Sequence, residues 1–252
     1  MLSDTQVALE LNSSSLKAIY IEAITLVTFI LEAGSLEELH LKFCIIKQFT
    51  FIGKGSLKHF EFEGGYVDSI DLGEVVNLEV VDVSDFTFSW LGLYQMISRS
   101  SNLRVLRIWA GFMEEIVYLE AIAKSFPYLT SLSFGCDLEE HWLHFVEEGS
   151  YQMQHLVVVE VGWEKIHDQF CPILDTFLEK CPIVKKLNVH GKVSATRTRE
   201  ECQTLANFTS SMIQLMRKYM HVDQIEHAFT VWKTGNSFRM QNTSFDFQYT
   251  SI

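Results

Sequence analysis

Two histidines, His141 and His144, are the residues of this sequence that come nearest to a metal-binding pattern, in the stretch Glu139-Glu-His-Trp-Leu-His144. Histidines three residues apart share one face of a helix, which suits a pair of zinc ligands. No third ligand follows at an informative spacing, so the stretch favours a solvated helical face. The sequence therefore predicts no metal site here.

Two acidic pairs, at residues 114–115 and 147–148, could be read as paired carboxylates for acid-base catalysis. Adjacent side chains point apart on a helix, so solvated surface is the better interpretation. The glycine-rich stretch Gly53-Lys-Gly-Ser56 lacks the Gly-Lys-Ser/Thr ending of a phosphate-binding loop and is typical of a turn. No nucleophile-elbow or H-E-x-x-H motif occurs either, and we expect neither an enzyme nor a cofactor.

The composition restricts the class of partner. The chain has 252 residues, of which 48% are hydrophobic, and 20 basic against 32 acidic residues give a net charge of −12. Nucleic acid and anionic membranes would have to bind against this charge, so neither is expected as a partner. The five cysteines show no C-x-x-C spacing, and the start of the chain lacks a signal-peptide pattern. These features predict reduced, buried thiols in a cytoplasmic and/or nuclear protein.

The elements that could position a binding site repeat along the chain. Each repeat contains a hexad with apolar residues at its first, fourth and sixth positions. The eight copies begin at Leu16, Leu36, Leu57, Leu78, Leu103, Leu129, Leu156 and Val184.

The spacings between these first residues are 20, 21, 21, 25, 26, 27 and 28, in the range of leucine-rich repeats. In each hexad the last two apolar residues alternate with polar ones, which predicts a short strand with one buried face. One strand cannot bury its own apolar row, whereas a stack of them can. We predict an α/β leucine-rich-repeat solenoid with a curved parallel sheet.

The segments between hexads differ along the chain. Residues 91–97, 116–124 and 173–181 carry apolar residues at helical spacing, which predicts helices on the convex side of the later repeats. The shorter early repeats have β-branched and aromatic residues there, as in Val27-Thr-Phe-Ile-Leu31, and we expect short extended segments. Residues 7–11 alternate as well and fit the back strand of a repeat.

The end of the chain has a different pattern. Thr198-Arg-Glu-Glu201 resembles a capping box that opens an amphipathic helix. The apolar face of this helix would carry Leu205, Phe208, Met212, Leu215, Met216 and Tyr219. We expect the solenoid to span residues 1–192, a helical cap that covers the open end of the core 193–232, and a disordered tail 233–252.

Several phrases resemble plant F-box/LRR-repeat proteins. These are Phe126-Pro-Tyr-Leu129, Lys180-Cys-Pro-Ile-Val184, Leu78-Glu-Val-Val-Asp-Val83, Tyr94-Gln-Met-Ile-Ser-Arg-Ser100 and Gln214-Leu-Met-Arg-Lys-Tyr-Met-His-Val222. The resemblance covers about residues 3–222.

In this family an amino-terminal F-box binds the Skp adaptor of a cullin ubiquitin ligase, and the repeats hold the protein to be ubiquitinated. Repeat sequence begins within a few residues of Met1, so the resemblance implies the substrate-holding half, as a fragment, an alternative gene model or a truncated paralogue. Skp and cullin are expected only if an F-box is supplied elsewhere. The alternative is a free-standing interaction or scaffold protein without a role in ubiquitination.

The strand register predicts which side chains face the open, concave side of the sheet. Those expected to bind a protein target are Tyr20, Glu38, His40, His59, Glu61, Asp82, Arg107, Trp109, Ser133, Glu160 and Asn188. Acidic residues outnumber Lys and Arg on this face, mostly in the early repeats, so we expect a target with a basic or polar segment. Asp82, Arg107 and Trp109 should be neighbours, and Trp and Arg are frequent interface hot spots. The alternative is that Trp109 only packs on its neighbours in the sheet.

Overall fold

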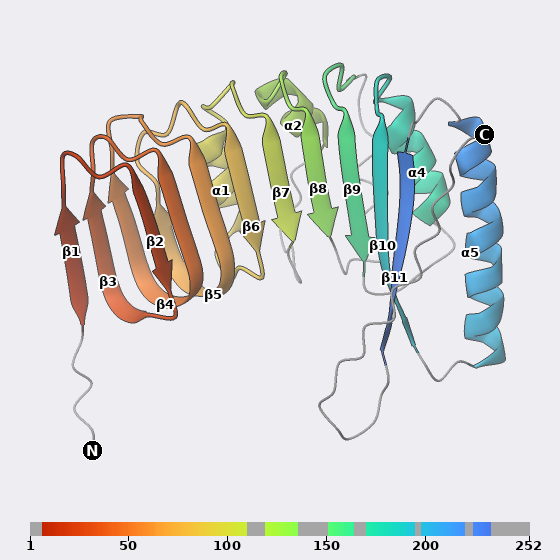
Figure 1. Ribbon diagram of the computed structural model, residues 1–252, viewed down its shortest axis with the longest axis horizontal. Coiled ribbons are helices and arrows are strands. Elements are labelled where there is room, and N and C mark those ends of the chain that lie inside the picture. The colour runs from red at the N-terminus through yellow and green to blue at the C-terminus, as the bar shows by residue number, and fades with distance from the viewer. Residues whose placement is uncertain are drawn as a thin grey trace.

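The computed structural model describes residues 7–109, 119–135, 151–163, 170–194, 198–219 and 224–232. Among these residues a parallel sheet of 11 strands runs along the length of the molecule (Figure 1). The strands are β1 Ala8–Asn12, β2 Ala18–Glu22, β3 Thr25–Glu32, β4 Glu38–Ile52, β5 His59–Asp71, β6 Val80–Ser84, β7 Val105–Trp109, β8 Ser131–Gly135, β9 Val158–Trp163, β10 Lys186–Ser194 and β11 Gln224–Trp232. The predicted leucine-rich-repeat solenoid is confirmed.

The early repeats fold as two-sided coils, as their β-rich connecting segments predicted. β4 and β5 are long strands that bend once. The first part of β4 pairs with β2 and with residues 59–63, and its second part pairs with β3 and with residues 65–71. β1 pairs with β3, which confirms that residues 7–11 contribute a back strand. We call the layer formed by β2, residues 38–42, residues 59–63 and β6 to β10 the front sheet.

A residue with positive φ stands at the bend of four successive coils. Ala23, Phe43, Gly64 and Asp85 have φ values of 55°, 52°, 56° and 49°. The chain reverses directly after the front strand, and the left-handed conformation makes this sharp turn. Gly65 continues the bend of β5 with a φ of 126°, where a Cβ atom would overlap the backbone nitrogen and carbonyl oxygen of Cys44.

Three rows of apolar side chains from the hexads run through the stack and form the front part of the core, which the back strands and the helices complete. The hexad positions align from strand to strand, so that Leu39, Phe60, Val81, Leu106, Leu132, Val159 and Leu187 form one buried row. A second row runs from Leu41 to Val189, and a third consists of the residues that open each hexad from Leu36 onward. Each coil thus buries its apolar residues against the next coil.

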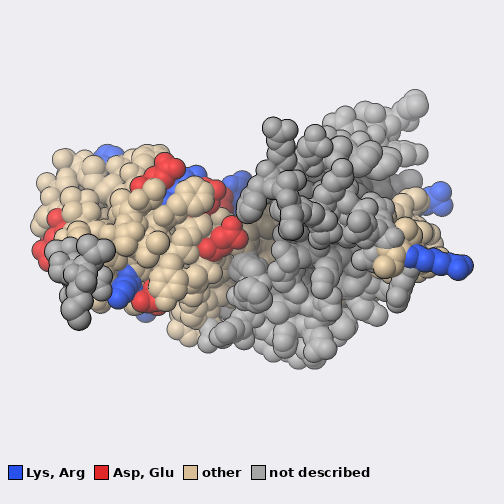
Figure 2. Space-filling view, turned by 90° about the horizontal axis from the view of Figure 1, so that it is seen from below, with Lys and Arg blue, Asp and Glu red and all other residues tan. Residues whose placement is uncertain are grey.

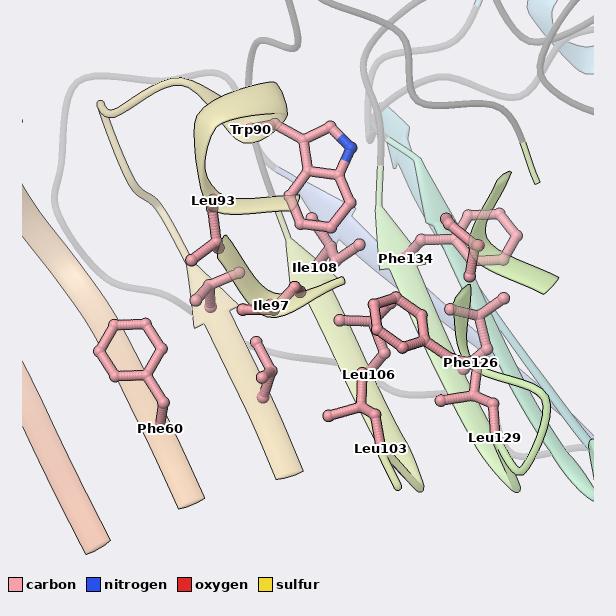
Figure 3. Packing of buried hydrophobic residues seen from close by; sticks show 14 of the residues in the cluster. Phe60, Trp90, Leu93, Ile97, Leu103, Leu106, Ile108, Phe126, Leu129 and Phe134 are labelled. Atoms are coloured by element: carbon pink, nitrogen blue, oxygen red, sulfur yellow. The ribbon is translucent and has the colours of Figure 1, made fainter. Parts of the chain in front are cut away.

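Helices replace the back strands in the later repeats, where the connecting segments are longer. α1 Trp90–Ile97, α2 Leu119–Ser125 and α4 Phe170–Glu179 confirm the predicted helical segments, except that residues 116–118 lie outside the described part. The side chains of Trp90, Leu93 and Ile97 point from α1 toward the front sheet, where Trp90 lies near Ile108 of β7 (Figure 3). These helices lie on one side of the front sheet only.

The carboxyl-terminal helix α5, Arg199–Lys218, begins directly after Thr198, as predicted. Phe208, Met212 and Leu215 of its apolar face are buried in the common core, and the Phe208 ring lies 5.7 Å from that of Phe170 in α4. Among the described residues, none of the helices is long and apolar enough to span a membrane.

The sheet continues past α5, which the sequence reasoning missed. Strand β11 falls inside the range assigned to the helical cap, and it pairs in parallel with β10 at the end of the sheet. The hexad pattern fails here because His227 occupies the register position of Val189, where an apolar residue was required. The expected tail, 233–252, lies outside the described residues.

The described cysteines are free thiols, and Cys44, Cys171 and Cys181 are buried. Burial raises the pKa of Cys171 and of Cys181 to about 12, which keeps both thiols protonated and unreactive. Cys202 was expected to be buried but is exposed. It lies on the polar face of α5, away from Phe208 and Met212.

Replacement of a residue in the buried row from Leu39 to Leu187 should cost much more stability than replacement of an exposed residue in the second part of β4. Leu106 is fully buried, so Leu106→Ala should lower the free energy of unfolding by about 2–5 kcal/mol. Ile45→Ala removes a side chain that is 49% exposed, and its cost should stay below about 1 kcal/mol. Chemical denaturation of both variants checks this, and equal losses would contradict the assigned core.

The bend at Gly65 should not tolerate a side chain. Gly65→Ala forces an L-residue into the φ of 126° against the backbone of Cys44, and we expect a loss of at least about 1–3 kcal/mol. Gly34→Ala is the matched control, since its Cβ would meet only the flexible Lys54 side chain at 3.4 Å. Thermal denaturation should show a lower midpoint for Gly65→Ala alone. A drop of the same size in Gly34→Ala would contradict this explanation.

Candidate protein-binding face

The sequence-predicted binding residues lie in three adjacent rows on the front sheet, on the side away from α1, α2 and α4. We call this side the open face. The middle row joins paired strands in the order Tyr20, His40, Glu61, Asp82, Arg107, Ser133, Glu160 and Asn188. Glu38 pairs with His59 in the row before it, and Trp109 lies in the row after it. The parallel register thus brings all the predicted residues onto one surface.

The open face begins with an aromatic side chain that is held in place. The Tyr20 hydroxyl donates a hydrogen bond of 2.7 Å to Glu38, and the Tyr20 ring stacks on His40 with centroids 4.2 Å apart. Tyr20 is nevertheless 66% exposed. This tyrosine is a large contact surface whose orientation is fixed before any partner binds.

A compact polar cluster surrounds His40. Its Nδ1 lies 2.5 Å from a carboxylate oxygen of Glu61, and its ring lies edge-on to His59 at 4.6 Å. Lys42 contacts both Glu61 and Glu63 at 2.8 Å. The carboxylates raise the pKa of the Lys42 ammonium, while burial, followed by the nearby His40, lowers the pKa of His59. Sequence reasoning placed these residues on one face but had no signal for their mutual contacts.

The acidic side chains expected on this face mostly contact other side chains of the same face. Glu38 accepts from Tyr20, Glu61 contacts His40 and Lys42, and Glu63 contacts Lys42. Acidic and basic side chains lie next to one another over the early coils in Figure 2. The carboxylates form a mixed polar surface, so their charge toward a partner is smaller than their number alone indicates.

The middle of the face carries the expected arginine and tryptophan. Arg107 forms an ion pair of 2.9 Å with Asp82 on the neighbouring strand, and 44% of its side chain is exposed. The Trp109 indole packs against Gly135, its register partner in β8, where a Cβ atom would overlap the ring. The contact between Trp109 and its sheet neighbour was the alternative considered from sequence. The indole ring of Trp109 therefore lies over Gly135, a residue without a side chain.

The later part of the face is more polar. Ser133 is buried and donates a hydrogen bond of 2.9 Å to Glu160 on β9. Asn188 follows in the same row on β10. Both side chains are less accessible than Tyr20 and Arg107, so the more exposed anchors lie in the early and middle coils.

The other candidate sites from the sequence lie in a turn or outside the described residues. Gly53 and Gly55 lie in the short turn between β4 and β5, where Gly55 has a φ of 71°, and the expected repeat turn is confirmed. His141 and His144 and the acidic pairs at 114–115 and 147–148 lie outside the described residues.

Comparison with known proteins identifies a relative. The chain is 45% identical over 226 residues to an F-box/LRR-repeat protein of Arabidopsis thaliana, and the match covers 88% of this chain. The chain spans about half, 54%, of the length of that curated relative. No family model matches the chain, and no solved structure matches it.

The hydrogen bond from Tyr20 should control the acidity of its partner on the open face. It is the main cause that lowers the pKa of Glu38, so Tyr20→Phe should raise that pKa toward the ordinary value. A lowered pKa stabilises the folded chain at neutral pH, and this contribution is lost as the pH falls through the ordinary value and then the lowered one. Carboxyl titration by NMR measures the shift. Tyr128→Phe, a change outside the three rows, should leave Glu38 unchanged, and an unshifted Glu38 in Tyr20→Phe would refute this assignment.

Proposed function

From the relationship of this chain to the plant F-box/LRR-repeat proteins, we propose that it is the part that recognises the substrate of a Skp-cullin-F-box ubiquitin ligase. The open face holds the target protein. An F-box, in a longer form of this chain or in an associated protein, connects the target to the Skp adaptor and the cullin.

The observation that carries the proposal is the unbroken middle row of polar and aromatic side chains across eight paired strands. Helices α1, α2 and α4 pack on the opposite side of the front sheet, so they do not cover this row. A surface made of strands that are locked in register offers a partner fixed contacts, which lowers the entropy cost of binding.

The anchors for the target are Tyr20, Arg107 and Trp109. Tyrosine, tryptophan and arginine are the residue types that most often dominate binding energy at protein interfaces. Tyr20 and Trp109 are each oriented by a neighbour, His40 and Gly135, and Arg107 is oriented by Asp82. The charged residues between these anchors give specificity for a basic or polar segment of the target.

Replacement of the middle anchors should abolish capture of the target while the fold stays intact. In affinity capture followed by mass spectrometry, Trp109→Ala combined with Arg107→Glu should lose the specific partner, with an affinity loss of ~2 kcal/mol or more. Tyr128→Ala combined with Arg104→Glu removes an exposed aromatic and an exposed arginine outside the three rows and should retain it. Unchanged capture by the first variant, with an unchanged circular dichroism spectrum, would refute the proposed face.

The role in ubiquitination needs its own measurement. If the chain acts in a ubiquitin ligase, the captured partner should become less ubiquitinated and more abundant when the gene is silenced. A partner whose ubiquitination and abundance stay constant would instead support a scaffold protein without a role in ubiquitination.

A further inference from the structure

Three potential metal ligands converge on the open face. His40 in β4 and His59 and Glu61 in β5 each offer one ligand atom, and these atoms lie within 4.8 Å of one another. The parallel register produces this cluster, because Glu61 is the partner of His40 and His59 is the partner of Glu38. The histidines are far apart in sequence, so no metal-binding motif marks them.

One ring nitrogen of this cluster is buried without a partner. His40 is only 6% exposed, and its Nε2 makes no hydrogen bond. An unsatisfied buried nitrogen costs free energy that a ligand would recover. An oxygen of Glu38 lies 3.6 Å from it, beyond hydrogen-bonding distance.

The other ring nitrogen of His40 is already paired. Nδ1 contacts the carboxylate of Glu61, which leaves Nε2 as the nitrogen without a hydrogen bond. The stacked Tyr20 ring restrains the imidazole from one side.

The local charge also suits a dication. The carboxylates of Glu38 and Glu61 lie beside His40, and Lys42 pairs with Glu61 and with a further carboxylate, Glu63. The net charge of these side chains is negative.

We propose that His40, His59 and Glu61 bind a divalent metal ion with the ligand preferences of zinc on the open face. Two imidazoles and one carboxylate are a ligand set that zinc accepts, and they leave a fourth position open to water or to a side chain of a bound protein. Metal binding recruits the unpartnered Nε2 of His40, and Glu61 leaves Nδ1 of His40 to bind the same ion. It draws the three side chains together, because zinc-ligand distances of ~2.0–2.2 Å require a narrower shell than the present 4.8 Å span.

Calorimetric titration of the full chain with Zn²⁺ at neutral pH tests the site without any protein partner. We expect saturable binding that includes one site dependent on this cluster. His59→Gln and Glu61→Gln should each weaken that site by about 10-fold or more. His155→Gln, which changes an exposed histidine near Tyr128, is the matched control and should bind as the original chain does.

Titration with Co²⁺ gives a second readout, because its absorption spectrum reports nitrogen ligation and low coordination number. The bands should be lost in His59→Gln and retained in His155→Gln, with both variants folded by circular dichroism. Zn²⁺ affinity and Co²⁺ spectra that are the same in His59→Gln as in the original chain, or the absence of saturable binding, would overturn the proposal. These results do not depend on whether the open face binds a target protein.

Discussion

No coil can pair its own backbone hydrogen-bonding groups or bury its own apolar residues, and the whole structure depends on this constraint. A chain of backbone hydrogen bonds of 2.7–2.9 Å passes from coil to coil where each front strand begins, from Glu37 to Lys17, from Lys58 to Glu37, and so on up to Lys185 and Val157. The apolar rows follow the same steps. Each coil is therefore stable only in a fixed register with its neighbours, and the same strand register continues through the stack.

The same register creates the functional surface. Side chains about 20–28 residues apart in sequence become direct neighbours, as Tyr20, His40 and Glu61 show. The packing of the apolar rows fixes the backbone of the front strands. The same backbone sets the positions of the polar side chains on the open face, so no separate scaffold is needed. Contacts within the open face then orient the individual side chains, such as Arg107 on Asp82. A binding surface of this type is preorganised by stacking rather than by loops.

Sequence reasoning reached the fold and the composition of the open face because both depend on periodicity. The hexad places Leu39 and Leu41 inward and His40 outward with no further information. Sequence reasoning missed β11, because His227 interrupts the apolar pattern there. It also could not find the cluster of His40, His59 and Glu61, because that cluster depends on which side-chain rotamers meet across strands. The internal pairing of the acidic residues was hidden for the same reason.

In the proposed complex, the target protein contacts the open face of the early and middle coils. Hydroxyl-radical footprinting of the chain with and without its captured target tests this directly, since it reports the solvent exposure of individual aromatic side chains. Tyr20 and Trp109 should become protected, while Tyr66 and Tyr128, which are 46% and 48% exposed and lie outside the rows of the open face, should keep their reactivity. Protection of Tyr66 or Tyr128 with unchanged Tyr20 and Trp109 would contradict it.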